Sequence, residues 1–374
     1  MAATPSRLLL KIEQALQAAE AGGERLNALV LRAQRALVLV RLGDLNEARD
    51  ELTALHQQAF ASPHPELSAW LHLAEGLTGM LQNLGNQASE HFHKALALAR
   101  LGRARSAEAQ AHRYLTNLAY YRHDLPALLV HAQAALALPA DTDPAAMAGV
   151  HLWVGLAHLY AGDVEASRPW QVACRVIATQ AGDDACVASL VYNTAELRVA
   201  QVRQAELGGG GSGSLPALLA CVNSADNFER AVGVASLQVL NPLLRAKVLV
   251  AEGRFAEAVA LYDVHLQPAV DQGLARLASS GHAELAWCHA NLGQTEFARQ
   301  HADAAAAALN ANVDHDDRAV THGRLAQAWG ELGDADRSQH HRAQAQVAWG
   351  AFNALQADWR DQLRASGLQA QPAG

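Results

Sequence analysis

The stretch SSGHAELAWCHANLGQTEFARQHADAAAAAL, residues 279–309, reads as two helices joined by a tight turn. Apolar and small side chains recur at helical spacing in its first half, namely Ala283, Leu285, Ala286 and Leu292. Gly293 then predicts the end of the first helix, because glycine readily adopts the left-handed conformation that a helix terminus often needs. The inner face of the second helix is predicted to consist of Phe297, Ala298, His301, Ala302 and Ala305. The stretch therefore predicts a helical hairpin.

The same pattern of small residues recurs elsewhere at a fixed spacing. Four times, an alanine lies seven residues before a glycine, and a second small residue lies five residues after that glycine. The four sets are Ala36, Gly43 and Ala48; Ala246, Gly253 and Ala258; Ala286, Gly293 and Ala298; and Ala326, Gly333 and Ser338. The last three glycines are forty residues apart. A fixed period in this range predicts stacked supersecondary units rather than one globular core.

The stretch GRFAEAVALYDVHLQP, residues 253–268, resembles the second half of a tetratricopeptide repeat (TPR). Its turn glycine, small residue, aromatic residue and closing proline are Gly253, Ala258, Tyr262 and Pro268. His265 departs from the small residue that is usual in the family. Residues 33–55 and 322–345 match nearly as well, and weaker copies extend the resemblance over most of residues 25–345. The forty-residue unit is similar to the extended TPR arrays of bacterial regulators, and HEAT repeats are the structural alternative.

The resemblance implies an all-α fold. We expect a right-handed α-α superhelix, a solenoid of about eight helical hairpins, over residues 1–364, with a disordered tail at 365–374. Abundant alanine and leucine fit this fold class. The run GGGGSGS, residues 208–214, is predicted to be a flexible loop within the array. A hinge between two halves of the superhelix and an engineered linker are the alternatives.

The C-terminal stretch from Ala343 to Arg364 carries an apolar stripe at helical spacing. The stripe consists of Trp349, Phe352, Leu355, Trp359 and Leu363. Its first interpretation is a capping helix that covers the last repeat, as a solenoid needs for solubility. A helix that forms a homodimer, or one that leads into an output domain, is the alternative.

Composition and charge narrow the classes of partner. The formal net charge is −8, and no cluster of lysine and arginine stands out, which disfavours direct binding of nucleic acid. No stretch approaches the roughly twenty apolar residues that span a bilayer, and the N-terminus MAATPSRLLLKIEQ lacks a signal-peptide pattern. The scattered cysteines predict buried free thiols in the cytoplasm; they are Cys174, Cys186, Cys221 and Cys288.

No motif for catalysis, cofactor binding or metal binding is evident. The sequence lacks a GxSxG elbow, a phosphate-binding GxxxxGK[ST] loop and a GxGxxG element. Several histidine clusters lack the spacing of metal ligands, namely His91 with His93, His340 with His341, and His282 with Cys288 and His289. The acidic cluster Asp314-His315-Asp316-Asp317 is predicted to cap the helix that follows. The sequence thus predicts no enzyme, no cofactor and no metal site.

The expected function lies on the inner groove of the superhelix. In the TPR family the first helix of each repeat lines this groove, and asparagine and basic side chains there often clamp an extended peptide. The candidates on such helices are Arg113, Asn117, Tyr120 and Tyr121; Tyr192, Asn193 and Glu196; and Asn241, Arg245 and Lys247. The leading hypothesis is a non-catalytic scaffold or regulatory module that binds a protein or peptide. The alternative is a sensor that closes around a small ligand or signalling peptide.

Overall fold

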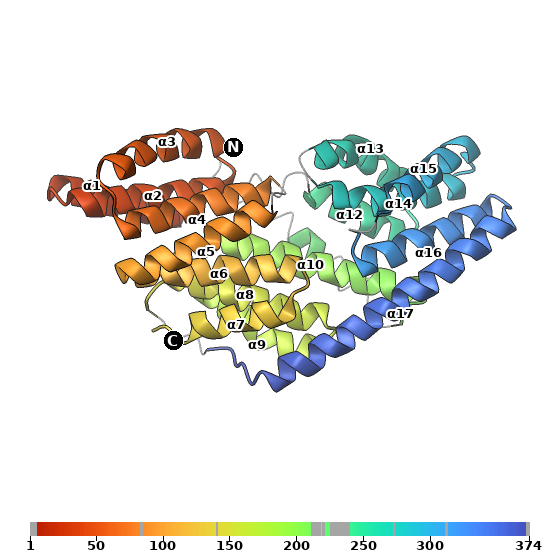
Figure 1. Ribbon diagram of the computed structural model, residues 1–374. Coiled ribbons are helices and arrows are strands. Elements are labelled where there is room, and N and C mark those ends of the chain that lie inside the picture. The colour runs from red at the N-terminus through yellow and green to blue at the C-terminus, as the bar shows by residue number, and fades with distance from the viewer. Residues whose placement is uncertain are drawn as a thin grey trace. The chain divides into compact units, whose positions relative to one another are not determined.

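The structure is a computed structural model, and it confirms an all-α solenoid of consecutive helical hairpins (Figure 1). It describes residues 6–82, 85–139, 141–210, 218, 221–224, 240–271, 274–310 and 313–371, and no strand occurs among them. Most of the chain between Gly210 and Leu240, including the end of the glycine-rich run, lies outside the described residues. No described helix is long and apolar enough to cross a membrane.

Contacts group the chain into two compact units, where the sequence predicts one array. Unit 1 contains the described residues up to Leu190 together with 359–371, and unit 2 contains the described residues from Val191 to Asp358. The first helices of the unit 1 hairpins are α2 (Arg25–Leu42), α4 (Pro65–Leu81), α6 (Arg105–Tyr121) and α8 (Pro144–Tyr160). Their second helices are α3 (Leu45–Ala61), α5 (Gly85–Gly102), α7 (Leu125–Leu136) and α9 (Val164–Ala181), and α1 (Arg7–Ala21) precedes them.

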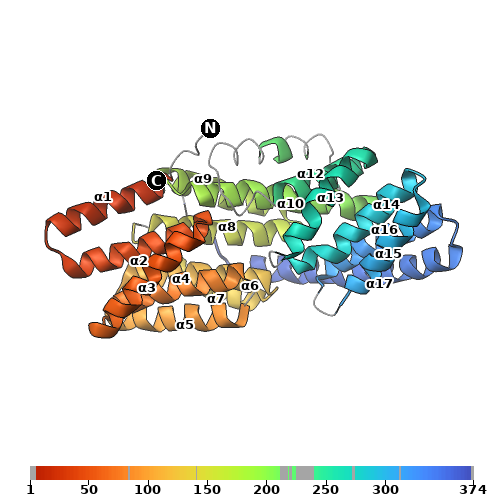
Figure 2. The ribbon, with the colours of Figure 1, turned by 90° about the horizontal axis from the view of Figure 1, so that it is seen from above.

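Unit 2 continues the same pattern of paired helices. Helix α10 (Asp184–Glu206) begins in unit 1 and ends in unit 2. The following hairpins are α12 (Leu240–Ala251) with α13 (Phe255–Asp271), α14 (Ala278–Asn291) with α15 (Thr295–Ala308), and α16 (His315–Glu331) with α17 (Ala335–Ala365). A short 3-10 turn, Ala275–Leu277, precedes α14. Figure 2 shows these pairs from a second direction. Contacts join α12 to α13 and α14 to α15, and His322 and His341 join α16 to α17.

The small residues of the repeating pattern lie where the two helices of a hairpin cross. Ala286 and Ala298 are both fully buried, as are Ala246 and Ala258. In the last hairpin the Ser338 hydroxyl donates a hydrogen bond to the Ala326 carbonyl at 2.8 Å. A larger side chain at these positions would separate the backbones, so alanine and serine set the close approach of the two helices.

The predicted glycine turns are present. Gly43, Gly253, Gly293 and Gly333 have positive φ values between 70° and 91°, which a residue with a Cβ rarely adopts. The turn between α6 and α7 has no glycine, and His123 takes the left-handed conformation there with φ of 53°. The left-handed turn conformation therefore occurs even where the sequence has no glycine to predict it.

Four of the five residues of the C-terminal apolar stripe are buried, and Leu355 is half-buried. Trp349 and Phe352, in unit 2, are each 4 % exposed, and Trp359 and Leu363, in unit 1, are nearly inaccessible. Beyond α17, residues 366–371 make hydrogen bonds within unit 1, although disorder was expected from residue 365 onward. The dimerisation alternative stays a prediction without support from this packing.

Candidate functional site

The four candidate groove residues of α6 differ widely in exposure. Arg113, Asn117 and Tyr120 are buried, whereas Tyr121 is 47 % exposed. The Arg113 guanidinium lies 4.9 Å from the centre of the Tyr114 ring. Arg113 and Asn117 thus contribute to the interior of unit 1, and Tyr121 is the candidate on this helix that a partner reaches most easily.

An aromatic cluster surrounds Tyr120 and includes a residue from the far end of the chain. The ring centre of Trp359 lies 5.0 Å from that of Tyr160 and 6.2 Å from that of Tyr120. The ring centre of His123 lies 6.0 Å from that of Trp359. Trp359 is 1 % exposed. The C-terminal end of the chain therefore occupies part of the surface where the sequence places a partner.

The residues that follow Trp359 are bonded to the ends and faces of α7 and α8. The Arg360 guanidinium donates to the Ala161 carbonyl at 2.7 Å. The backbone N–H of Gln371 donates to Nε2 of His151 at 3.2 Å, and its side chain donates to the Leu136 carbonyl at 2.9 Å. Every residue of α8 after Pro144 is buried. We call residues 359–371 the C-terminal segment.

The candidate residues of unit 2 are also engaged within the chain. Lys247 on α12 forms an ion pair with Glu196 on α10. Burial alone would raise the pKa of Glu196, but the charge of Lys247 and its hydrogen bond lower it below its ordinary value. Asn241 is 2 % exposed, and Arg245 is exposed. Tyr192 is buried and Asn193 is half-buried, both on α10.

A chain of buried charges extends this contact along unit 2. Arg203 of α10 lies 2.9 Å from Glu284 of α14, and Arg324 of α16 lies 2.9 Å from the same carboxylate. Arg324 also donates two hydrogen bonds to Glu206, near the end of α10. The second half of α10 thus lies against three successive first helices of unit 2, and its charges are matched to theirs.

Four histidine pairs recur in the hairpins with a separation of nineteen residues. The two Nδ1 atoms of each pair are 2.9 to 3.1 Å apart. The pairs are His72 and His91, His112 and His131, His282 and His301, and His322 and His341. The same position holds an Arg32–Glu51 ion pair in one hairpin and a His151–Trp170 ring contact in another. Each pair joins the first helix of a hairpin to its second.

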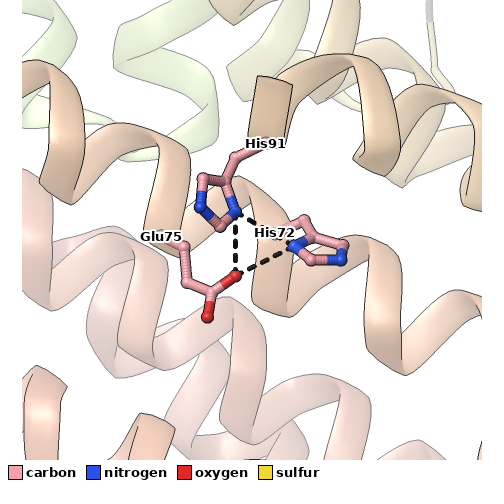
Figure 3. A group of neighbouring side chains, drawn as sticks. All are labelled: His72, Glu75 and His91. Carbon is pink, nitrogen blue, oxygen red and sulfur yellow. Dashed lines mark hydrogen bonds and ion pairs between the residues drawn. The ribbon is translucent and has the colours of Figure 1, made fainter. Parts of the chain in front are cut away.

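The first histidine pair differs from the others because a carboxylate completes it. Glu75 lies three residues after His72 on α4, so both side chains project from one face of that helix. Its Oε2 atom is 2.9 Å from Nδ1 of His72 and 3.0 Å from Nδ1 of His91, which α5 supplies (Figure 3). His56 on α3 lies with its Nε2 atom 2.8 Å from the other carboxylate oxygen. We call His72, Glu75 and His91 the His–Glu cluster.

The His–Glu cluster borders a hollow of about 180 Å³. Glu75 and His91 line it together with Leu52, Thr78, Gly79, Gln82 and Gln87. The three side chains of the cluster are 27 to 30 % exposed. Solvent therefore reaches these groups, although they lie between the two helices of one hairpin.

Electrostatics keep the carboxylate of the cluster ionised. Burial by itself would raise the pKa of Glu75, but the hydrogen bond from His72 and the charges of His56, His72 and His91 lower it. An ionised carboxylate beside two imidazole nitrogens can bind a cation or accept protons. The sequence analysis missed this cluster because it compared histidines that are close in sequence. The repeated nineteen-residue separation was the available signal.

Comparison with protein-family models and with curated proteins gives no match. The TPR assignment therefore rests on the spacing of motifs within this chain and stays a prediction. The described hairpins, with small residues at their crossings and glycine at most turns, are compatible with it.

Proposed function

We propose that the chain is a TPR-like, non-catalytic module that binds a protein or peptide segment on its first helices. The observation that carries the proposal is the position of the C-terminal segment on unit 1. This segment carries a deeply buried aromatic anchor, Trp359, near the end of α17, and Gln371 beyond the helix is bonded through its backbone N–H and its side chain. The same combination is common in peptide recognition, where a few buried aromatic residues supply most of the binding free energy.

The surface under the C-terminal segment has the chemistry to bind such a chain. The last carbonyl groups of a helix have no partner within it. The carbonyl of Leu136 at the end of α7 and that of Ala161 just after α8 are such groups, and both accept hydrogen bonds from the segment. Tyr120 and Tyr160 supply the apolar contacts for the anchor. A partner that presents an aromatic residue near the end of a helix, followed by a short non-helical stretch, would use the same groups.

Unit 2 supports the proposal independently. The first helices α12, α14 and α16 contribute Lys247, Glu284 and Arg324, whose charges alternate in sign. They form ion pairs with the oppositely charged Glu196, Arg203 and Glu206 of α10. A face that selects a helix by its charge order is suited to specific recognition, because a wrong partner would leave buried charges unpaired.

The test measures binding of the chain's own segment supplied as a separate peptide. A fluorescein-labelled peptide of residues 355–371 is titrated with the full chain carrying Trp359→Ala, and its fluorescence anisotropy is followed. We expect saturable binding, because the variant chain leaves the aromatic site to the peptide. The wild-type chain should bind it more weakly, since its own segment competes at a millimolar effective concentration.

A matched peptide carrying Trp359→Ala is the control. It should not bind either chain. Equal binding of both peptides, or no binding of the wild-type peptide to a folded Trp359→Ala chain, would overturn the proposal. Far-UV circular dichroism verifies that this variant chain keeps its helices.

A further inference from the structure

We propose that His72, Glu75 and His91 form a binding site for a divalent transition-metal ion, with Zn²⁺ as the expected occupant. The ligand atoms are Nδ1 of both histidines and Oε2 of the glutamate. They come from α4 and α5, two helices of one hairpin in unit 1. No part of the proposed peptide-binding surface is needed for this site.

The three atoms already form a triangle of nearly the required size. Its sides are 2.9, 3.0 and 3.1 Å. Ligands about 2.05 Å from a tetrahedral zinc ion are about 3.3 Å from one another. The sides must therefore lengthen by only about 0.2 to 0.4 Å for a metal centred about 0.7 Å above the triangle. Small side-chain rotations provide this change without movement of the helices.

The donor set favours zinc and its neighbours over calcium or magnesium. Imidazole nitrogen binds zinc, nickel and copper well, whereas calcium and magnesium prefer oxygen donors. Both Nδ1 atoms face the same carboxylate oxygen, and a neutral imidazole can present the lone pair of one ring nitrogen to a metal while the other nitrogen carries the proton. The charge of the ion would be neutralised in part by the ionised Glu75.

The surroundings of the cluster resemble the outer shell of a metal site. Ligating carboxylates are usually held by a further hydrogen bond, which fixes the oxygen that binds the metal. His56 supplies this contact to Oε1 of Glu75 and leaves Oε2 toward the two histidines. The adjoining hollow of about 180 Å³ has room for water at a fourth coordination position.

The chain offers its own comparison for this site. The histidine pairs of the other hairpins have the same separation and nearly the same Nδ1–Nδ1 distance. The residues that correspond to Glu75 in them are Leu115, Leu285 and Leu325. Among the described residues, the His–Glu cluster is the group in which three donor atoms converge. The carboxylate therefore distinguishes a metal site from a structural histidine pair.

The test is a titration of the full chain after treatment with a chelator. Zn²⁺ binding is measured by calorimetry, and Co²⁺ is used as a spectroscopic probe because its visible bands report tetrahedral coordination. We expect one strong site per chain with tetrahedral Co²⁺ bands. Glu75→Gln and His91→Gln should both abolish that site, and His56→Ala should weaken it by about 10- to 100-fold.

His131→Gln is the matched control, because it breaks a histidine pair that lacks the carboxylate. It should keep the strong site with unchanged stoichiometry. The proposal is overturned if the wild-type chain shows no saturable binding, or if Glu75→Gln binds Zn²⁺ as tightly as wild type. It is also overturned if His131→Gln weakens Zn²⁺ binding as much as Glu75→Gln does. If Glu75→Gln does not fold, as judged by circular dichroism, His91→Gln decides the outcome.

Discussion

The pair of His112 and His131 predicts that acid destabilises the chain through a specific residue. His112 is 3 % exposed, and its Nδ1 atom lies 3.1 Å from that of His131. Burial, the neighbouring His131 and the Arg100 guanidinium lower the pKa of His112 to about 4, against a small opposing effect of Glu108. Arg100 approaches from α5, with its Nη2 atom 3.3 Å from Nε2 of His112.

The sign and size of the effect follow from proton linkage. In the unfolded chain His112 has a pKa near its ordinary value of 6.5, so the unfolded state binds more protons than the folded state between about pH 6.5 and pH 4. The free energy of unfolding therefore falls as the pH is lowered through this window. Between pH 7.5 and pH 5, His112 alone accounts for a loss of about 2 kcal/mol.

The measurement compares wild type with His112→Gln. Guanidinium unfolding is followed by circular dichroism at pH 7.5 and at pH 5, and the free energy of unfolding is obtained by linear extrapolation. We expect the variant to lose about 2 kcal/mol less than wild type between the two pH values, whatever its stability at pH 7.5. His315→Gln, at an exposed position, should behave like wild type. The reasoning is refuted if His112→Gln and wild type lose the same free energy of unfolding between pH 7.5 and pH 5.

Two further predictions concern packing and buried charge. A Cβ atom at Gly76 would lie 2.5 Å from the fully buried Phe92 ring, so Gly76→Ala should reduce the free energy of unfolding by about 1–3 kcal/mol. In Gly79→Ala, on the same helix, the added Cβ meets no atom closer than 3.6 Å, so this variant should be neutral or stabilised by up to about 1 kcal/mol. The prediction is contradicted if chemical unfolding shows the same loss of unfolding free energy in Gly76→Ala and Gly79→Ala. Arg324→Met removes one of the two arginines that face Glu284 and should cost about 3–5 kcal/mol. A loss below about 1 kcal/mol in the same assay, as for an exposed ion pair, would show that these charges are not effectively buried.

Much of the hairpin architecture was predictable because its signals are local. The small residue at a helix crossing and the glycine at a turn each satisfy a steric requirement of their own repeat. Gly253 and Ala258 show both requirements within six residues of sequence. The left-handed conformation at His123 had no such signal, because a left-handed residue with a Cβ leaves no distinctive mark in a single sequence.

Which residues pack onto the first helices of the hairpins could not be predicted in the same way. The sequence analysis placed Tyr120 and Lys247 on groove-lining helices, but it could not show that Trp359 and Glu196 contact them. Trp359 is 239 residues from Tyr120, and helical periodicity carries no information about such a contact. Long-range packing of this kind depends on how successive hairpins stack, which no local pattern determines.

The repeated histidine pairs also show how a functional position can be separated from a structural one. Four hairpins carry the pair, while others place Arg32 with Glu51 or His151 with Trp170 at the same crossing. Because ionic, aromatic and imidazole pairs all satisfy this position, the pair itself is explained by packing between the two helices. Glu75 is not explained in that way, since leucine occupies its place in the other three histidine hairpins. The departure from the repeat, rather than the repeat, is therefore where a chemical role is to be sought.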